Sequence, residues 1–145
     1  MNTNTNKVEL SPEQEIGLQR LEQLADFDPV AAGHDRKFDF SEYHNVFDCG
    51  TSGCKIGECP LIWEEWRYWY TGDCLEPAIN NLFLAESIEF WFLINSAESD
   101  YLFQPKKLGH HTPKIALPAT ATAEQVNERI LNFVKNKREG KPCLV

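Results

Sequence analysis

The chain has 145 residues, of which 42% are hydrophobic and 12% aromatic, and its formal net charge at pH 7 is −8. A chain of this length corresponds to one domain and can bury a core without disulfides or a metal. Its longest apolar run, Phe90–Ile94, is far shorter than the ~18–20 residues of a membrane span, so we expect no membrane association. We predict a single compact domain over residues 10–138, with a disordered tail over 1–9 and a short tail over 139–145.

The negative charge is concentrated in one part of the chain. Residues 1–104 carry 19 acidic and 6 basic side chains, whereas residues 105–145 carry 3 acidic and 8 basic ones. An acidic body repels a phosphate backbone and favours basic partners, so we expect no nucleic-acid partner. The N-terminal residues lack the basic and apolar regions of a signal peptide. Because the cysteine count is five, an odd number, we also expect reduced thiols and a cytoplasmic location.

The first predicted helix begins at Ser11-Pro12-Glu13-Gln14. These residues make a capping box, with serine at the N-cap, proline at the first helical position and glutamine at the third. Apolar residues follow at helical spacing: Leu18, Leu21, Leu24 and Ala25. The pair Asp28-Pro29 predicts that the helix ends near Phe27.

Helical spacing of apolar residues predicts four further helices. They cover residues 61–70, 86–92, 96–103 and a last segment between Thr122 and Gly140. The last helix has the clearest signals, because Thr122 to Gln125 is a second capping box and Gly140 follows its end. Residues 104–121, which include three prolines, are predicted to form a loop. The fold is therefore predicted to be mainly α, with few or short strands.

The segment FDCGTSGCKIGECP, residues 47–60, holds three of the five cysteines and three of the eight glycines. Thr51 or Ser52 can cap a helix that begins at Ser52 or Gly53, since either hydroxyl can accept a hydrogen bond from a free amide. Pro60 would break or kink that helix. We therefore predict a short central helix rich in glycine and cysteine.

Two reactive interpretations of this segment have weak support. His44, Cys49, Cys54 and Cys59 recur every five residues, whereas structural zinc sites pair cysteines at C-x₂₋₄-C spacing, and we assign no metal. A thiolate at Cys54 would be stabilised in the first turn of the helix. A nucleophilic thiol also needs a base within hydrogen-bond reach, and the sequence places none of the four histidines beside Cys54.

Two further interpretations are ligand capture and packing. Free amides at a helix start would bind a small anion through Gly50, Thr51, Ser52, Gly53 and Cys54. The segment is nevertheless neither a P-loop nor a Rossmann fingerprint. Alternatively, its small side chains let the short helix pack deep among the four tryptophans: Trp63, Trp66, Trp69 and Trp91. We prefer the packing interpretation for the cysteines, and core packing rather than a ligand wall for the tryptophans.

Four segments resemble a family of small bacterial and phage-associated proteins of unknown function. They are FDF (38–40), CGTSGCKIGEC (49–59), YLFQP (101–105) and ATAEQVNERILNF (121–133). Members carry a C-G-T-x-x-C-x-x-G segment, then L-F-x-P, then a capped closing helix, and the resemblance spans about residues 36–135. Members often continue with G-W-A after the second cysteine, where this chain reads Gly57-Glu58-Cys59-Pro60. The resemblance implies a compact, largely helical intracellular domain and supplies no catalytic residue.

From the sequence we predict a non-enzymatic binding module whose partner is a protein or a small ligand. We assign no catalytic residue and no cofactor, because no acid–base constellation is evident. Two alternatives remain. One is a thiol-dependent enzyme that uses Cys54, and the other is capture of a nucleotide-like anion at the Thr51–Cys54 helix start.

Overall fold

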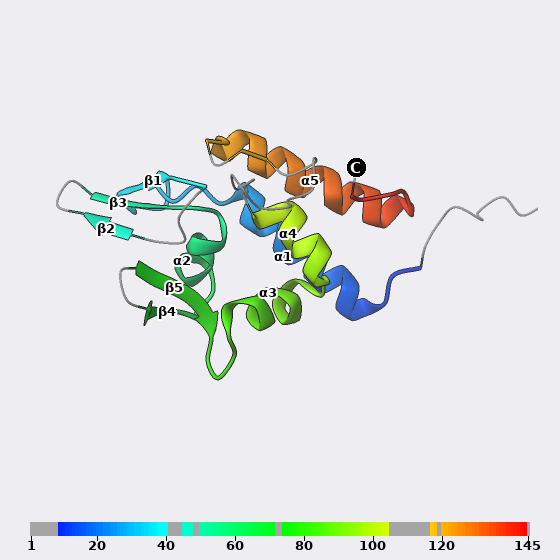
Figure 1. Ribbon diagram of the computed structural model, residues 1–145. Coiled ribbons are helices and arrows are strands. Elements are labelled where there is room, and N and C mark those ends of the chain that lie inside the picture. Colours follow the sequence, from blue (N-terminus) through cyan, green and yellow to red (C-terminus); the bar gives the residue numbers. More distant parts are fainter. Residues whose placement is uncertain are drawn as a thin grey trace, which may run out of the picture.

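The computed structural model describes residues 9–40, 45–47, 50–71, 74–104, 117–118 and 120–144. Within these residues the elements are α1 (Pro12–Asp26), β1 (Arg36–Phe38), β2 (Asn45–Phe47), β3 (Gly50–Gly53), the 3-10 turn η1 (Ile56–Glu58), α2 (Cys59–Ile62), β4 (Trp66–Thr71), β5 (Cys74–Ile79), α3 (Leu84–Phe92), α4 (Ser96–Phe103) and α5 (Ala123–Glu139). The protein is mainly helical with short strands, as the sequence predicts. The strands gather at one end of the helices (Figure 1). The predicted tail over 1–9 and loop over 104–121 fall almost entirely outside the described residues.

The capped helices begin where their sequence signals place them. In α1 the Gln14 amide donates to Ser11 Oγ at 3.1 Å, and the Ser11 amide donates to Gln14 Oε1 at 2.8 Å. Thr122 and Gln125 form the same reciprocal pair at the start of α5. The helix α4 covers the predicted residues, but its N-cap is Asn95 rather than Ser96. A capping box forms within one helical turn, so the start of such a helix can be predicted without knowledge of the tertiary packing.

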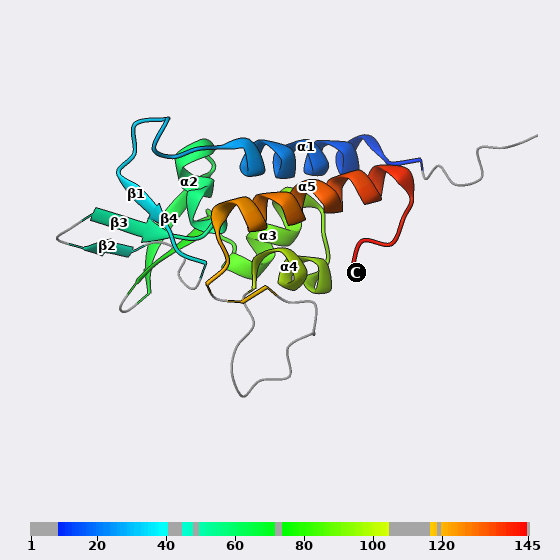
Figure 2. The same cartoon turned by 90° about the horizontal axis from the view of Figure 1, so that it is seen from above.

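Two helices, α5 and α3, pack closely against the N-terminal helix α1. The long helices α1 and α5 lie side by side (Figure 2), and the Arg138 guanidinium on α5 pairs with Glu15 and Glu22 on α1. On another side α1 approaches α3 so closely that a Cβ on Gly17 would overlap the backbone carbonyl of Phe92. The absence of a side chain at Gly17 therefore sets the separation of α1 and α3.

Two small sheets contain the strands. The first has the order β1-β3-β2, with β3 parallel to β1 and antiparallel to β2, and the second is the antiparallel pair β4–β5. The prediction of a helix over residues 61–70 is wrong beyond Ile62, because β4 starts at Trp66. Aromatic residues favour strands, and a two-residue alternation runs through this segment: Trp66 is buried while Arg67 and Trp69 are exposed. Trp63 and Trp66 fit a helical spacing equally well, which misled the prediction.

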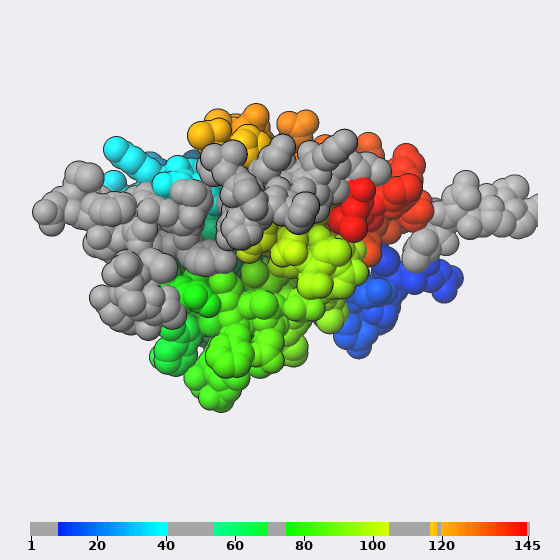
Figure 3. Space-filling view, viewed as in Figure 1, coloured from blue at the N-terminus to red at the C-terminus, as the bar shows by residue number. Residues whose placement is uncertain are grey.

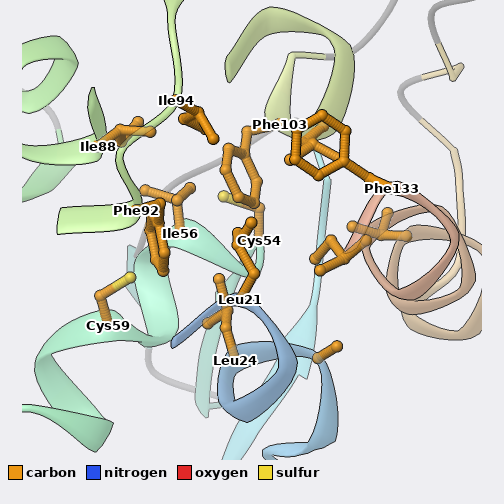
Figure 4. Close-up of a cluster of buried hydrophobic side chains, with 14 of the residues drawn as sticks. Leu21, Leu24, Cys54, Ile56, Cys59, Ile88, Phe92, Ile94, Phe103 and Phe133 are labelled. Atoms are coloured by element: carbon orange, nitrogen blue, oxygen red, sulfur yellow. The ribbon is translucent and has the colours of Figure 1, made fainter. Parts of the chain in front are cut away.

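The core lies where η1 and α2 meet the helices. Figure 4 shows Cys54, Ile56 and Cys59 among apolar side chains from α1, α3, α4 and α5. Ile56 and Cys59 are fully buried, and Gly57 lies between them in the same short helical segment. The predicted short central helix is present only in part: its helical residues run from Ile56 to Ile62 and include Gly57 and Cys59 but not Cys54. The predicted break at Pro60 is wrong, because α2 runs through this residue. None of the helices in the described part of the chain is long and apolar enough to cross a membrane.

Candidate functional site

The predicted ligand site at Gly50–Cys54 does not have the expected backbone. Residues 50–53 form β3, the central strand of its sheet, with β1 paired along one edge and β2 along the other. The prediction that a helix starts at Ser52 or Gly53 is wrong, because these pairings use the backbone amides and carbonyls that a helix start would leave free. Helical structure begins at Ile56 instead, and Pro60 lies in the first turn of α2, where its missing N–H costs no hydrogen bond.

The cysteines of this segment do not form a reactive centre in the part of the chain that is described. Cys54 is 3% exposed and Cys59 is fully buried, and both are free thiols. Burial raises the pKa of Cys54 to about 11, against the opposing effects of the nearby Gly57 and Ile56 amides and the charge of Arg36. Burial likewise raises the pKa of Cys59. Both thiols are therefore protonated at neutral pH, which removes the nucleophilic form.

Metal binding can be assessed for part of the predicted cysteine series. Cys49 and His44 lie outside the described residues. Among the residues that are described, no group of three or more histidine, cysteine, aspartate or glutamate side chains is placed to hold a metal ion. The described cysteines Cys54 and Cys59 are instead members of the apolar core, which is the packing interpretation preferred from the sequence.

A buried ion network lies next to Cys54, and sequence reasoning missed it. Lys55 Nζ is 2.8 Å from Glu58 Oε1, and Arg36 Nη1 is 3.3 Å from Glu58 Oε2. Lys55 also donates to the Phe27 carbonyl at 2.8 Å, and Arg36 donates to the Cys54 carbonyl at 3.0 Å. Burial raises the pKa of Glu58, while the two cations act against this effect. The i,i+3 spacing of Lys55 and Glu58 was visible in the sequence, but neither their burial nor the contribution of Arg36 was.

This network borders a cavity of about 310 Å³ between the end of α1 and the start of α5. The described charges that face it from the network are already paired with each other and with backbone carbonyls. Its arrangement joins three segments that are distant in sequence: the C-terminus of α1, the strand β1 and the turn η1. Lys55 and Arg36 each pair with Glu58 and donate to a backbone carbonyl, and Glu58 pairs with both cations. Because every buried charge of the network has an opposite charge, we assign the network a structural role.

The second sheet has a buried face and an outer face. In an antiparallel pair, residues opposite each other project to the same side. Trp69 is opposite Glu76, and Arg67 is opposite Ala78, so these four share the outer face. The other face carries Trp66, which is 2% exposed, and Tyr68, whose hydroxyl donates to the Gly57 carbonyl at 2.6 Å. Tyr68 thereby anchors the hairpin on the central turn, and burial raises its pKa.

A groove of about 410 Å³ lies over the outer face of this hairpin. We call it the hairpin groove; it is lined by Trp69 of β4, Glu76 and Ala78 of β5, and residues 80–84. The loop between β5 and α3, which forms one of its walls, is at the bottom of Figure 1 and belongs to the green part that projects downward in Figure 3. Trp69 is 44% exposed and Phe83 is 81% exposed. Two large exposed aromatic side chains at one groove are typical of a binding surface.

The wall of the hairpin groove is held in place by hydrogen bonds. Ser87 Oγ accepts from the Ile79 amide at 2.9 Å and donates to the Phe83 carbonyl at 2.8 Å. The Phe83 amide donates to Glu86 Oε1 at 3.2 Å. The turn itself uses Asn81 in the left-handed region, with φ of 69°, a conformation that asparagine tolerates well. The backbone that carries the exposed Phe83 ring is therefore held by hydrogen bonds at Ile79, before the turn, and at Phe83 itself.

The sequence prediction of core packing is confirmed for three of the four tryptophans, because Trp63 also packs against the core, and it is wrong for Trp69. Trp66 and Trp91 are buried, with their rings at a centroid distance of 6.4 Å, as expected for core residues. Trp69 instead lines the hairpin groove. Its position in a strand, one residue out of phase with Trp66 and Tyr68, is the signal that could have shown this.

Comparison of the chain with known protein families, curated proteins and solved structures yields no match. The resemblance of residues 36–135 to small bacterial and phage-associated proteins stays a prediction. The function must therefore be argued from the site itself.

Proposed function

We propose that the protein is a small cytoplasmic binding module without catalytic activity, and that it holds its partner in the hairpin groove. The observation that carries this proposal is the exposure of Trp69 and Phe83, two large aromatic side chains in the lining of one groove. Aromatic side chains supply large contact areas and are enriched among the residues that dominate binding energy. The free thiols of Cys54, Cys59 and Cys143 fit a reducing compartment.

The dimensions and rigidity of the hairpin groove support the same function. Its volume of about 410 Å³ is within the usual range of ligand pockets, at its lower end. That size accommodates a few side chains of a peptide. Because Ser87 and Glu86 fix the wall that carries Phe83, little ordering entropy is lost when a partner binds. Aliphatic contacts are available from Ala78 and Leu84, and polar ones from Glu76 and the two asparagines at 80 and 81.

Two features weigh against the alternatives. A thiol-dependent reaction would need Cys54 to be accessible and ionised, whereas it is 3% exposed and its pKa is raised to about 11. Anion capture at Thr51–Cys54 required a helix start, whereas residues 51–53 belong to the central strand β3.

The test is a selection of random peptides on the immobilised protein, followed by affinity measurements on the selected peptides with purified variants. We expect Trp69→Ala and Phe83→Ala each to weaken binding by about tenfold or more, as for truncated aromatic hot spots. Phe90→Ala is the matched control, because Phe90 is 60% exposed on α3 and does not line the groove. Selected peptides that bind the two groove variants as tightly as the native protein, or a selection without enrichment, would contradict the proposal.

A further inference from the structure

The segment of the chain that contains the hairpin groove is acidic. Residues 63–92 contain six acidic side chains and one basic side chain. Glu76 lies on the groove itself and is the cross-strand partner of Trp69. None of the described side chains forms an ion pair with Glu76, which is partly buried. The nearby basic side chain Arg67 shares the outer face of the hairpin but does not line the groove. A partner that enters the groove thus meets a carboxylate that forms no ion pair with the described side chains, opposite an indole ring.

We propose that the hairpin groove recognises the cationic side chain of a lysine or arginine in a basic peptide. This inference rests on the proposed function and names its ligand. The head of such a side chain would lie near the Glu76 carboxylate, and its apolar stem would lie against Trp69 and Phe83. Lysine and arginine combine these two properties, because a long aliphatic stem ends in a charge.

The chemistry of the lining favours this ligand over others. A cation gains from a carboxylate through a charge-assisted hydrogen bond, and from the face of an aromatic ring through its quadrupole. An anionic ligand would be repelled by Glu76 and by the surrounding acidic side chains. A wholly apolar ligand would cover Glu76 and the side chains of Asn80 and Asn81 without replacing their hydrogen bonds to water, which is unfavourable.

The same molecule offers an internal comparison for cation–aromatic contact. The guanidinium carbon of Arg20 lies 3.6 Å from the centroid of the Trp91 ring, and that of Arg129 lies 4.2 Å from the centroid of Tyr101. Both arginines also donate to a backbone carbonyl, Arg20 to Trp91 and Arg129 to Tyr101. These pairs combine an aromatic ring with a hydrogen-bond acceptor, and Trp69 and Glu76 are likewise a ring and an acceptor that lie opposite each other in the hairpin.

The experiment uses short acetylated and amidated peptides that differ at one central residue: lysine, arginine, norleucine or Nε-acetyl-lysine. Norleucine keeps the aliphatic stem without the charge, and acetyl-lysine keeps the length without the charge. Each peptide is titrated to millimolar concentration into the full-length isotope-labelled protein. The backbone amide NMR signals of Trp69, Glu76 and Asn81 are followed, together with the indole signal of Trp69. We expect the lysine and arginine peptides to shift these signals, with the norleucine and acetyl-lysine peptides binding at least about threefold more weakly.

Two variants make the test specific to the groove. Glu76→Gln removes the charge with almost no change of shape, and we expect it to weaken binding of the lysine peptide by about threefold or more. Glu128→Gln is the control, because it makes the same change of net charge at an exposed position of α5, away from the groove. General attraction to the acidic protein would respond equally to both variants and would overturn the inference.

The outcomes separate this inference from the proposed function. Equal groove shifts with lysine and norleucine peptides, unaffected by Glu76→Gln, would overturn cation recognition and leave a groove that binds apolar side chains. Absence of any groove shift with the lysine and arginine peptides would also overturn it, and the peptide selection would then decide the proposed function on its own. Selective shifts with lysine and arginine that depend on Glu76 support the inference.

Discussion

The ammonium group of Lys55 lies 2.8 Å from the carboxylate of Glu58, and both residues are only 2% exposed. The same ammonium donates to the carbonyl of Phe27, which caps the end of α1. A lysine from the cysteine-containing segment therefore joins the first helix to the central turn. Buried charges of this kind specify position, because an alternative packing would leave at least one of them unpaired.

Replacing Lys55 by methionine should strongly destabilise the protein. Lys55→Met keeps the volume but leaves Glu58 with Arg36 as its remaining described cation and deprives the Phe27 carbonyl of its donor. Breaking a buried pair in this way costs about 3–5 kcal/mol of unfolding free energy. Urea unfolding followed by tryptophan fluorescence measures the loss. In the control, Lys141→Met removes an exposed pair with Glu139 and should leave the unfolding free energy almost unchanged. Similar small losses for both variants would contradict the structural role.

The native protein should protect two of its thiols from alkylation. Cys54 and Cys59 are buried and protonated at neutral pH, whereas Cys143 is partly exposed. Treatment with iodoacetamide near pH 7.5, followed by peptide mass spectrometry, should label Cys143 first and label Cys54 and Cys59 only after urea is added. Fast labelling of Cys54 in the native protein would instead revive the thiol-site alternative.

The same burial predicts that stability falls in alkaline solution. The folded-state pKa of Cys54 is raised from about 9 to about 11, so the buried thiol contributes its full stability below pH 9 and loses it as the pH rises toward 11. For one such group the slope is about 1.4 kcal/mol per pH unit between these values. Cys59 and Tyr68, whose pKa values are also raised, add to the slope. Urea unfolding across this range should show the decrease, and Cys54→Ala should reduce the slope without abolishing it. An unchanged slope in this variant would show that Cys54 does not contribute.

The sequence could predict those elements whose signals are local. Capping boxes at Ser11 and Thr122 lie within a single turn of their helices, and both helices begin there. The helix assigned to residues 61–70 failed because strand β4 depends on its pairing with β5, which no spacing rule within one segment can report. Likewise β3 became a strand through its pairing with β1, whose residues lie 15 positions earlier in the chain, as in Arg36 opposite Thr51.

The candidate site could be predicted only in part, for the same reason. The acidic character was evident and led to the expectation of a basic partner, whereas the tryptophans were all expected in the core. Which tryptophan is exposed depends on the phase of β4. The groove depends on the turn at Asn81, which joins β5 to the residues that include Phe83. The predicted site at Gly50–Cys54 failed because its amides are taken by neighbouring strands, which are contributed by more distant residues.

Adding one methyl group at Gly17 should destabilise the contact between α1 and α3. In Gly17→Ala the new Cβ would overlap the carbonyl of Phe92, so the helices must separate. Overpacking of this kind costs about 1–3 kcal/mol, although alanine is the better helix former by about 1 kcal/mol. Thermal and urea unfolding would measure the net loss. Gln19→Ala, at an exposed position of the same helix, should change the unfolding free energy by less than about 0.5 kcal/mol. A Gly17→Ala protein that is more stable than the native one would refute the close approach.

The contact between α1 and α5 should show an acid-dependent contribution from Arg138. Its guanidinium lies 2.6 Å from Glu15 and 2.8 Å from Glu22, and all three side chains are about one-third exposed. The hydrogen bond from Arg138 lowers the pKa of Glu22, so the stability gained from this pair is present above the ordinary pKa of 4.5 and is lost as the pH falls through the lowered value.

We therefore expect Arg138→Gln to lower the unfolding free energy at neutral pH by about 0.5–1 kcal/mol, the upper part of the range for exposed ion pairs. The difference from the native protein should shrink as the solution is acidified, and added salt should also reduce it. Lys135→Gln makes the same charge change on the same helix, at an exposed position whose ammonium forms no ion pair with the described residues. Urea unfolding of the three proteins at neutral and acidic pH decides the point: a loss of equal size for both variants would mean that net charge, and not the contact with Glu15 and Glu22, is responsible.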